Sequence, residues 1–327
     1  MARFLTWLTP SSDQLHLGNY FGALQPMIEL QKKHGKDDDF FLFLSNLHAL
    51  TKDNRDASKI RQNSLNIIKL YIASGVDPDK FFIYRQSDVS AHTELLWVFQ
   101  CLTTMGFMER MHVYKDALAK WKANLLSVGA FAYPILMAVD IILYDVDYVP
   151  VGKDQKQHVE YARDITDKFN QQFGEIFKLP EAYIQEDLAT VPGIDGRKMS
   201  KSYDNYIWLL DTEEIITKKI KKIPTAPIPI DQPKNPDEDN VYQMYKLFLS
   251  EDEDQALRER YQAGWLSYKD VKDELLWHIL EFVRPLQERF ASISESEVES
   301  MLADNALKAR EMTQAKRDEV YKLVGLS

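Results

Sequence analysis

The sequence predicts an α/β fold: a doubly wound parallel sheet followed by a mostly helical domain. Two observations predict it. Short apolar runs alternate with long amphipathic segments in the first half of the chain, and this strand signal fades after about residue 205. The length of 327 residues suits two domains better than one. We therefore expect an α/β domain over residues 1–205, a helical domain over 206–300 and a C-terminal helix over 301–327 that packs back on the first domain.

The first half of the chain contains four short apolar runs of the kind found in buried parallel strands. Amphipathic patterns between them predict helices over Tyr20–Lys33 and Ala57–Ser74, the second of which ends before Gly75. In a doubly wound sheet, ligands bind at the carboxyl ends of the strands, so we expect the site beside the first strand. The predicted strands are Phe4–Leu8, Phe40–Leu44, Phe81–Tyr84 and Tyr148–Val151.

The second half reads as helices separated by one proline-rich loop. Asp211 with Glu214 is typical of a helix start, and that helix would run into the lysines at 218–222. Five prolines between Ile223 and Pro236 predict an extended loop. Helical patterns then resume over Val241–Phe248, Tyr268–Phe290 and from Glu295 to the end.

Composition restricts the class of protein. The N-terminal segment is too polar for a signal peptide or a membrane span, so we expect a cytoplasmic protein without a membrane partner. The net charge of −10 argues against general nucleic-acid coating, including a DNA partner. The single cysteine, Cys101, lies in an apolar run, where we expect it to be buried and inert. Two local basic sets, which are ordinarily solvated helix faces, are Lys218, Lys219, Lys221 and Lys222, and Arg110, Lys115, Lys120 and Lys122.

The most specific motif is the pentapeptide Lys198-Met-Ser-Lys-Ser202. Two lysines three residues apart can place two ammonium groups around one phosphate chain, and the serines add hydroxyl donors. An exposed basic loop is the alternative interpretation. The second motif, His16-Leu-Gly-Asn19, opens the first predicted helix just after the first strand. A helix N-terminus binds phosphate, and Gly18 allows the backbone to approach a nucleotide closely.

Together these motifs resemble the signature pair of class I aminoacyl-tRNA synthetases, whose catalytic domain is Rossmann-like. The segments Tyr133–Tyr144 and Val149–His158 narrow the resemblance to tryptophanyl-tRNA synthetases, and the run before the pentapeptide, Val191–Arg197, is similar to one bacterial subgroup. The similarity extends over nearly the whole chain. It implies ATP-dependent activation of L-tryptophan and its transfer to tRNA(Trp), with Mg²⁺ bound through the ATP phosphates and no metal site on the protein.

The resemblance implies an ATP site built from the first loop, the helix start, the loop after the fourth strand and the pentapeptide. Catalysis would depend on His16, Asn19, Lys198 and Lys201, which neutralise charge that develops on the phosphates. His158, on the following helix, is expected to serve structure. The implied ATP-binding residues are Thr9, Pro10, Ser11, Gly18, Asn19, Gly152, Lys153, Asp154, Val191, Lys198, Met199, Ser200, Lys201 and Ser202.

Asp140 is the centre of the implied tryptophan site. It sits in an otherwise apolar helical segment, where a carboxylate is costly unless something pairs with it. An indole N–H could be that partner; a capping or salt-bridged Asp140 is the alternative. Met137, one turn earlier, would pack on the indole, although core packing explains it equally well. The resemblance adds five neighbours of the amino acid to these two: Tyr133 and Gln155 at its α-amino group, His48 at its ring, and Leu5 with Trp7 on the first strand.

Trp7 departs from the family pattern, which usually has glycine at the end of the first strand. The loop from Pro10 to His16 also lacks the usual glycine and is closer in length to that of bacterial tyrosyl enzymes. Tyrosyl specificity is therefore the nearest rival, and the residues at Met137 and Asp140 disfavour it. The other rivals are a non-ligating paralogue that binds RNA or amino acid, and a small-molecule nucleotidyltransferase, which would lack the helical domain.

The resemblance also implies partners. The helical domain would read the anticodon of tRNA(Trp), with the lysines of the first basic set on phosphates and Arg110 and Lys115 as weaker candidates. Family members are homodimers, and the apolar segment Leu95–Met108 is a candidate for the dimer contact; core packing explains that segment equally well.

Overall fold

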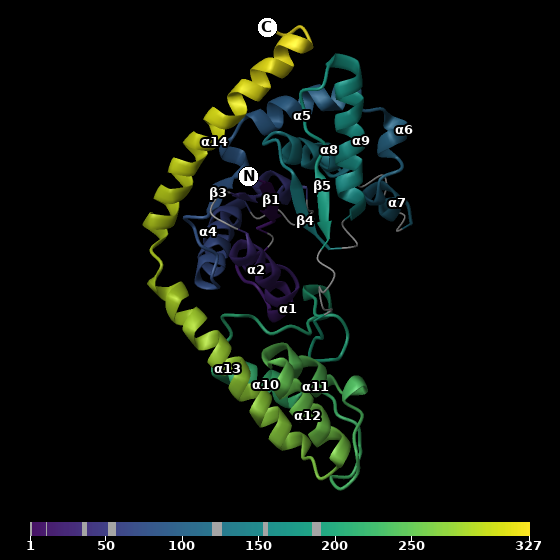
Figure 1. Ribbon diagram of the computed structural model, residues 1–327, viewed down its shortest axis with the longest axis vertical. Coiled ribbons are helices and arrows are strands. Elements are labelled where there is room, and N and C mark those ends of the chain that lie inside the picture. The colour runs from purple at the N-terminus through teal and green to yellow at the C-terminus, as the bar shows by residue number, and fades with distance from the viewer. Residues whose placement is uncertain are drawn as a thin grey trace.

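The computed structural model describes residues 2–10, 12–34, 38–51, 57–119, 126–152, 156–184 and 191–327, and only the backbone of 57, 58, 112, 113 and 117. Its described strands form one parallel sheet in the order β3-β2-β1-β4-β5. The chain winds outward from β1 in both directions, as predicted for a doubly wound fold. The α/β part lies above the helical part in Figure 1. The strands are β1 Arg3–Leu8, β2 Asp39–Leu44, β3 Phe81–Arg85, β4 Tyr148–Val151 and β5 Glu181–Ile184.

Helices cover both faces of the sheet, because successive side chains of each strand point to opposite sides. Phe40 and Leu42 of β2 belong to a core shared with α2 and α4, whereas Phe41 and Phe43 belong to a core shared with α5, α8 and α9. The helices of this part are α1 Leu17–Asn19, α2 Gln25–Lys33, α3 Asn46–Ala49, α4 Ala57–Ala73, α5 Ala91–Leu102, α6 Met105–Met108, α7 His112–Ala119, α8 Val128–Ile142 and α9 Lys156–Phe173.

The helix predicted over Tyr20–Lys33 is divided in the structure. A π-helical segment, Tyr20–Leu24, separates α1 from α2, and the N–H of Gln25 donates to the carbonyl of Tyr20, five residues earlier. Pro26 follows directly at the start of α2. Because proline has no N–H and crowds the preceding turn, the regular four-residue hydrogen-bond ladder stops there.

Strand β5 was not predicted from the sequence. It has four residues, and the first of them, Glu181, is exposed while the others are half-buried. A short strand at the edge of a sheet has no continuous apolar run, which is the signal that identified the other four strands.

Cys101 is exposed, contrary to expectation. It lies on α5, where Leu95, Val98 and Phe99 face the core and Trp97 faces outward with 68% of its surface exposed. The apolar run around Cys101 therefore wraps around a helix with one buried face and one open face.

The helical part begins with α10 Glu213–Lys221. Its N-terminal cap is Thr212, whose hydroxyl accepts a hydrogen bond from the N–H of Ile215 at 3.4 Å. The predicted cap, Asp211, instead accepts from the N–H of Trp208 at 2.9 Å and from the ammonium of Lys219. The remaining helices are α11 Asn240–Tyr245, α12 Glu251–Ala263, α13 Tyr268–Ser292 and α14 Glu295–Leu323; α12 was not singled out by the sequence analysis.

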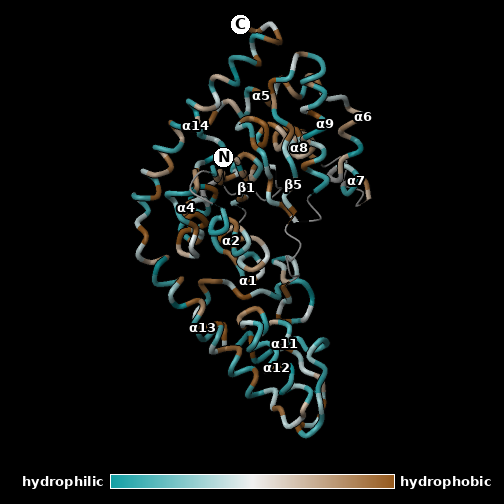
Figure 2. The backbone as a smooth tube through the Cα atoms, viewed as in Figure 1, coloured by the Kyte–Doolittle hydropathy of each residue, from teal (hydrophilic) through white to brown (hydrophobic). Residues whose placement is uncertain are grey.

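Helices α13 and α14 follow one another along one edge of the molecule and join its two parts (Figure 1). Hydrophobic and hydrophilic stretches alternate along α14 in Figure 2, as in a helix with one packed face. Helix α14 packs against β3, α4 and α5, and Arg317 on it pairs with Glu94 of α5 at 2.9 Å. The domain boundary expected at residue 300 falls inside α14, because the break between α13 and α14 lies at Ile293–Ser294. None of the helices in the described ranges is apolar enough over sufficient length to span a bilayer.

Candidate active site

A cavity of about 270 Å³ opens at the carboxyl ends of β1 and β2, beneath α8. This is where ligands bind in doubly wound sheets, beside the strand at which the winding reverses. A larger hollow of about 690 Å³ lies at the opposite, amino ends of β2 and β3 against α14, away from both sequence motifs. Residues lining the smaller cavity are Trp7, Thr9, Phe43, His48, Thr51, Tyr133, Met137, Asp140 and His158.

Asp140 is fully buried on the inner face of α8, and its carboxylate accepts hydrogen bonds from three side chains. Nε2 of His48 lies 2.8 Å from Oδ2, and Nδ1 of His92 lies 2.7 Å from Oδ1. The amide nitrogen of Gln86 is 2.8 Å from both oxygens. The sequence predicted that Asp140 needs a partner, and these three donors meet that need. A buried carboxylate without donors would cost a large amount of folding free energy.

The electrostatics of Asp140 favour its charged form. Burial raises the pKa of this carboxyl, but its interactions with His48 and His92, hydrogen bonds first, have the larger combined effect and lower the pKa below its usual value. Asp140 therefore presents an acceptor, and not a hydroxyl donor, to the cavity at neutral pH.

The second element of the site is the helix start at His16. Nδ1 of His16 accepts from the N–H of Asn19 at 3.1 Å, and the side-chain oxygen of Asn19 accepts from the N–H of His16 at 3.1 Å. This reciprocal capping box fixes the imidazole at the mouth of α1. The ring also lies against the aromatic rings of Tyr206 and Trp208.

His16 is held neutral. Burial, and then the positive charge of Lys201, lower its pKa to about 4. Since Nδ1 accepts from the backbone, the remaining proton of the neutral ring is on Nε2. His16 thus offers one N–H donor without adding a charge.

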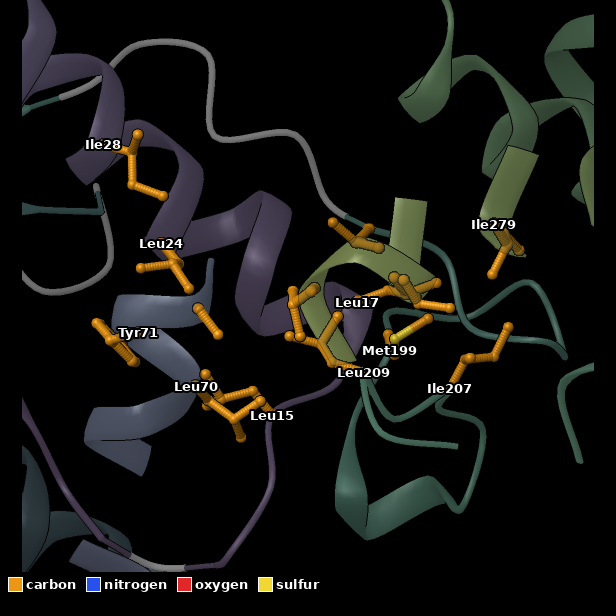
Figure 3. Close-up of a cluster of buried hydrophobic side chains, with 14 of the residues drawn as sticks. Leu15, Leu17, Leu24, Ile28, Leu70, Tyr71, Met199, Ile207, Leu209 and Ile279 are labelled. Carbon is orange, nitrogen blue, oxygen red and sulfur yellow. The ribbon is translucent and has the colours of Figure 1, made fainter. Parts of the chain in front are cut away.

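The pentapeptide loop packs directly on this helix start. The N–H of Gly18 points at the sulfur of Met199, 3.1 Å away, and a Cβ at Gly18 would stand 2.9 Å from Nδ1 of His16 and 3.1 Å from Cβ of Met199. Glycine is therefore required at this position by close approach. Figure 3 shows Met199 beside Leu17, Leu209 and Ile207 in one buried cluster that extends to Ile279 of α13.

The lysines of the loop remain at the surface of this junction. Lys198 is exposed, and the ammonium of Lys201 donates to the hydroxyl of Ser12 in the first loop and lies 5.4 Å from the ring of Trp208. Asn205 holds the loop by accepting from the N–H of Ser200 at 2.8 Å. Ser200 in turn accepts at its hydroxyl from the N–H of Ser202.

The other predicted ATP-site residues fall into three groups. Thr9 lines the cavity and shares a hydrogen bond with Ser45 at 2.9 Å, and Pro10 beside it is buried. Gly152 directly follows β4, and Val191 is buried with its carbonyl accepting from the N–H of Met199 at 2.8 Å. Predictions that fall outside the described residues are those for Ser11, Lys153, Asp154 and Gln155.

Most of the residues predicted to bind the amino-acid substrate meet at one cavity. Tyr133, Met137 and His48 line it with Asp140, and the ring of Tyr133 contacts the ring of His48. Trp7 lines it too, against Phe43, so its indole forms a wall of the cavity and does not turn away. Leu5, two residues before Trp7 on β1, is fully buried and is not among the residues that line the cavity.

The described members of the two basic sets lie in different parts of the molecule; Lys120 and Lys122 of the second set fall outside the described residues. Lys218 pairs with Glu214 at 2.6 Å and Lys219 with Asp211 at 2.7 Å, whereas Lys221 and Lys222 are exposed at the end of α10. In the α/β part, Lys115 is exposed on α7, and the guanidinium of Arg110 lies over the ring of Phe107.

Sequence reasoning missed Gln86 and His92, the two fully buried partners of Asp140. A signal was available, because Gln86 directly follows β3 and His92 lies in the first turn of α5. Polar residues just after a strand are candidates for a site at the carboxyl edge of the sheet. The pairing of Phe43 with Trp7 and the contribution of Ser12 to the lysine loop were also not foreseen.

Comparison with known proteins agrees with this geometry. The family model described as tRNA synthetases class I (W and Y) matches residues 2–284. The tryptophan–tRNA ligase of Campylobacter jejuni is 42% identical over 99% of this chain and 100% of its own length. This chain belongs to the tryptophanyl-tRNA synthetase family.

Other relatives extend the same result. The tryptophan–tRNA ligase of Fusobacterium nucleatum is 42% identical over all of this chain and 98% of its own length. A crystal structure of the Campylobacter jejuni tryptophanyl-tRNA synthetase with ADP and tryptophan has a TM-score of 0.89 and 41% identity over 99% of this chain and 100% of that one. The Mycoplasma pneumoniae enzyme has a TM-score of 0.80 at 29% identity, covering 100% of this chain and 98% of that one.

Proposed function

We propose that this chain is a tryptophan–tRNA ligase, which activates L-tryptophan with ATP and transfers it to tRNA(Trp). The observation that carries the proposal is the junction of two motifs with one cavity. The His16 helix start and the Lys198–Ser202 loop pack on one another, and the ammonium of Lys201 reaches Ser12 in the first loop. Thr9, at the start of that loop, lines the cavity that contains the ionised, buried Asp140. The residues for phosphate chemistry are thereby linked to the residues that select an amino acid whose side chain carries an N–H donor.

Activation is a displacement at phosphorus. The carboxylate of tryptophan attacks the α-phosphorus of ATP, the bond to the bridging oxygen breaks, and pyrophosphate leaves together with Mg²⁺ as the substrate's counterion. Negative charge grows on the phosphate oxygens, and Lys198 and Lys201 are the cations available to offset it. Nε2–H of His16, whose Nδ1 is already bonded to the N–H of Asn19, donates to the same oxygens. The ribose hydroxyl of tRNA then attacks the acyl carbon, and AMP departs.

A neutral His16 suits this role. A charged imidazole would compete with Lys201 for its position, and the pKa of about 4 avoids that conflict at physiological pH. The side chain is fixed before ATP arrives, because its Nδ1 is already bonded to the helix cap. Such preorganisation lowers the cost of reaching the transition state.

Amino-acid selection depends on Asp140 and the walls around it. The carboxylate accepts the indole N–H, while Met137 and Phe43 provide apolar surface and Tyr133 stands near His48. A site built around a hydrogen bond rejects analogues without the donor far better than one built on shape. Trp7 reduces the room in this pocket relative to the glycine of the family pattern, so the substrate stacks against an indole wall.

Further parts of the proposal concern assembly and tRNA. Residues 1–205 form the catalytic domain, residues 206–300 read the anticodon, and residues 301–327 tie the two together as part of α14. Lys221 and Lys222, exposed at the end of α10, contact tRNA phosphates. The chain works as a cytoplasmic homodimer through the surface that includes Trp97 and Met105, which are 68% and 64% exposed.

The experiment that tests the proposal is exchange of labelled pyrophosphate into ATP with tryptophan, tyrosine or phenylalanine. We expect rapid exchange with tryptophan alone. Exchange with tyrosine would preserve the phosphate chemistry and overturn the assignment of Asp140. A Lys201→Ala variant is the control, since it should lose exchange while it still binds tryptophan. Absence of exchange with all three amino acids, from folded protein supplied with Mg²⁺, would contradict the proposed function.

A further inference from the structure

His92 is a fully buried imidazole that the mechanism above does not use. It lies in the first turn of α5 and is not among the residues that line the cavity. Both of its ring nitrogens are engaged: Nδ1 lies 2.7 Å from Oδ1 of Asp140, and Nε2 lies 3.0 Å from the hydroxyl of Tyr144. The result is a three-residue chain, Tyr144–His92–Asp140, that runs from the turn just after α8 back to the carboxylate in the last turn of that helix.

The direction of the hydrogen bonds in this chain is set by its ends. An ionised Asp140 has no proton to give, so Nδ1–H of His92 must donate to it. In a neutral imidazole the other nitrogen is then an acceptor, and the hydroxyl of Tyr144 donates to it. Burial raises the pKa of Tyr144, so its hydroxyl keeps its proton. Tyr144 therefore fixes the tautomer of His92, and the tautomer fixes the donor to Asp140.

The three donors to Asp140 differ in their access to the cavity. His48 lines it, and 14% of its side chain is exposed. Gln86 and His92 are fully buried behind the carboxylate, on the side of β3 and α5. Of the three, His48 is the donor positioned to move when an indole N–H arrives. The two rear donors hold the carboxylate in place throughout.

We propose that His92, held by Tyr144, is a positioning residue that keeps the Asp140 carboxylate aimed at the cavity as an acceptor, and so sets the preference for a substrate that carries an N–H. This inference rests on the proposed function, and it concerns specificity, not the chemical step. It follows that weakening His92 costs binding of the indole N–H more than it costs shape recognition. Residues that do not touch the substrate commonly control its affinity by orienting the side chain that does touch it.

The test compares tryptophan with its isostere 3-(benzothien-3-yl)alanine, in which sulfur replaces the indole N–H. Pyrophosphate exchange gives kcat/KM for both substrates with wild type, His92→Leu, His92→Asn and Tyr144→Phe. Because the readout is a ratio within one protein, loss of folded material affects both values equally and cancels. Asn keeps a donor at the position of Nδ1, and Tyr144→Phe leaves the imidazole in place if His92→Leu fails to fold.

We expect the wild type to prefer tryptophan and His92→Leu to lose about tenfold or more of that preference, the size typical of one hydrogen bond to a charged acceptor. His92→Asn should retain most of it, and Tyr144→Phe should lose an intermediate share. Phe99→Leu is the matched control, a buried change on α5 against Phe169 and Phe177 that should leave the preference unchanged.

Two results would overturn the inference. Equal losses for both substrates in His92→Leu and Tyr144→Phe, with the preference intact, would make His92 a packing residue and leave the proposed function standing. No exchange with tryptophan by the wild type would overturn the proposed function and this inference with it.

Discussion

The neutral state of His16 has a measurable consequence for stability. Its pKa falls from an ordinary value of 6.5 to about 4 in the folded protein, through burial first and Lys201 second. A histidine with a lowered pKa binds its proton more weakly in the folded state than in the unfolded state. Acid therefore favours the unfolded chain, and the stabilisation present above pH 6.5 is lost progressively as the pH falls towards 4.

The size of the effect follows from the shift. About 2.5 pKa units correspond to about 3 kcal/mol at 1.36 kcal/mol per unit, most of it already expressed at pH 5. Because the loss is incomplete at pH 5 and charges in proteins are partly screened even when buried, we expect about 1–2 kcal/mol between pH 7.5 and pH 5. The perturbation that isolates this contribution is His16→Asn. Asparagine is a good N-cap and does not titrate, so it preserves the bond to the N–H of Asn19.

Urea unfolding of both proteins at pH 7.5 and pH 5 is the assay. All other titrating groups are common to the two, so the difference between their losses of unfolding free energy belongs to His16. We expect the wild type to lose about 1–2 kcal/mol more than His16→Asn over this range. Parallel losses would refute the reasoning, because they would mean that His16 has an ordinary pKa in the folded protein.

Three other predictions concern the motif junction and the helical domain. Lys201→Ala should lower the rate of activation by about a hundredfold or more while tryptophan affinity changes about twofold or less. The same variant should raise the pKa of His16 in an NMR titration, because the nearby positive charge is removed. Equal losses of rate and of tryptophan affinity would count against this role of Lys201. Gly18→Ala should lower kcat/KM for ATP about tenfold or more, since its Cβ would press on His16 and Met199, and unchanged kinetics would show that the loop does not approach in solution. Lys234 is buried, and its ammonium donates to the carbonyls of Pro229 and Gln232 at 3.2 Å. Lys234→Met should therefore lower the stability of the helical domain by about 1–3 kcal/mol in thermal unfolding, while tryptophan-dependent exchange persists. Loss of exchange in this variant would refute the idea that the helical domain can be destabilised without affecting activation.

The fold was largely predictable because buried parallel strands and amphipathic helices carry strong local patterns. The strand predicted over Tyr148–Val151 has the bounds observed for β4, and the helix predicted from Glu295 to the end is α14 up to Leu323. Edge strand β5 lacked such a pattern. The π-helical segment before Pro26 depends on which hydrogen bonds survive near one proline, and that competition is not visible in an apolar period.

The site was predictable where a motif has a rigid meaning and less so where partners come from elsewhere in the chain. Gly18 and the lysine loop were expected to share a ligand, and the structure brings Gly18 within 3.1 Å of Met199. Asp140 was expected to need a partner, but His92 and Gln86 reach it across 48 and 54 residues of chain. Contacts of this kind depend on how α5 and α8 pack, which no local pattern specifies.

The most direct test of the central claim is aminoacylation with labelled tryptophan, using tRNA(Trp) and tRNA(Tyr) transcripts side by side. The account predicts that tRNA(Trp) is charged with tryptophan, that tRNA(Tyr) is not, and that tyrosine is not attached to either transcript. Charging of tRNA(Tyr) with tyrosine, or failure to charge tRNA(Trp) by protein that folds normally, would contradict it.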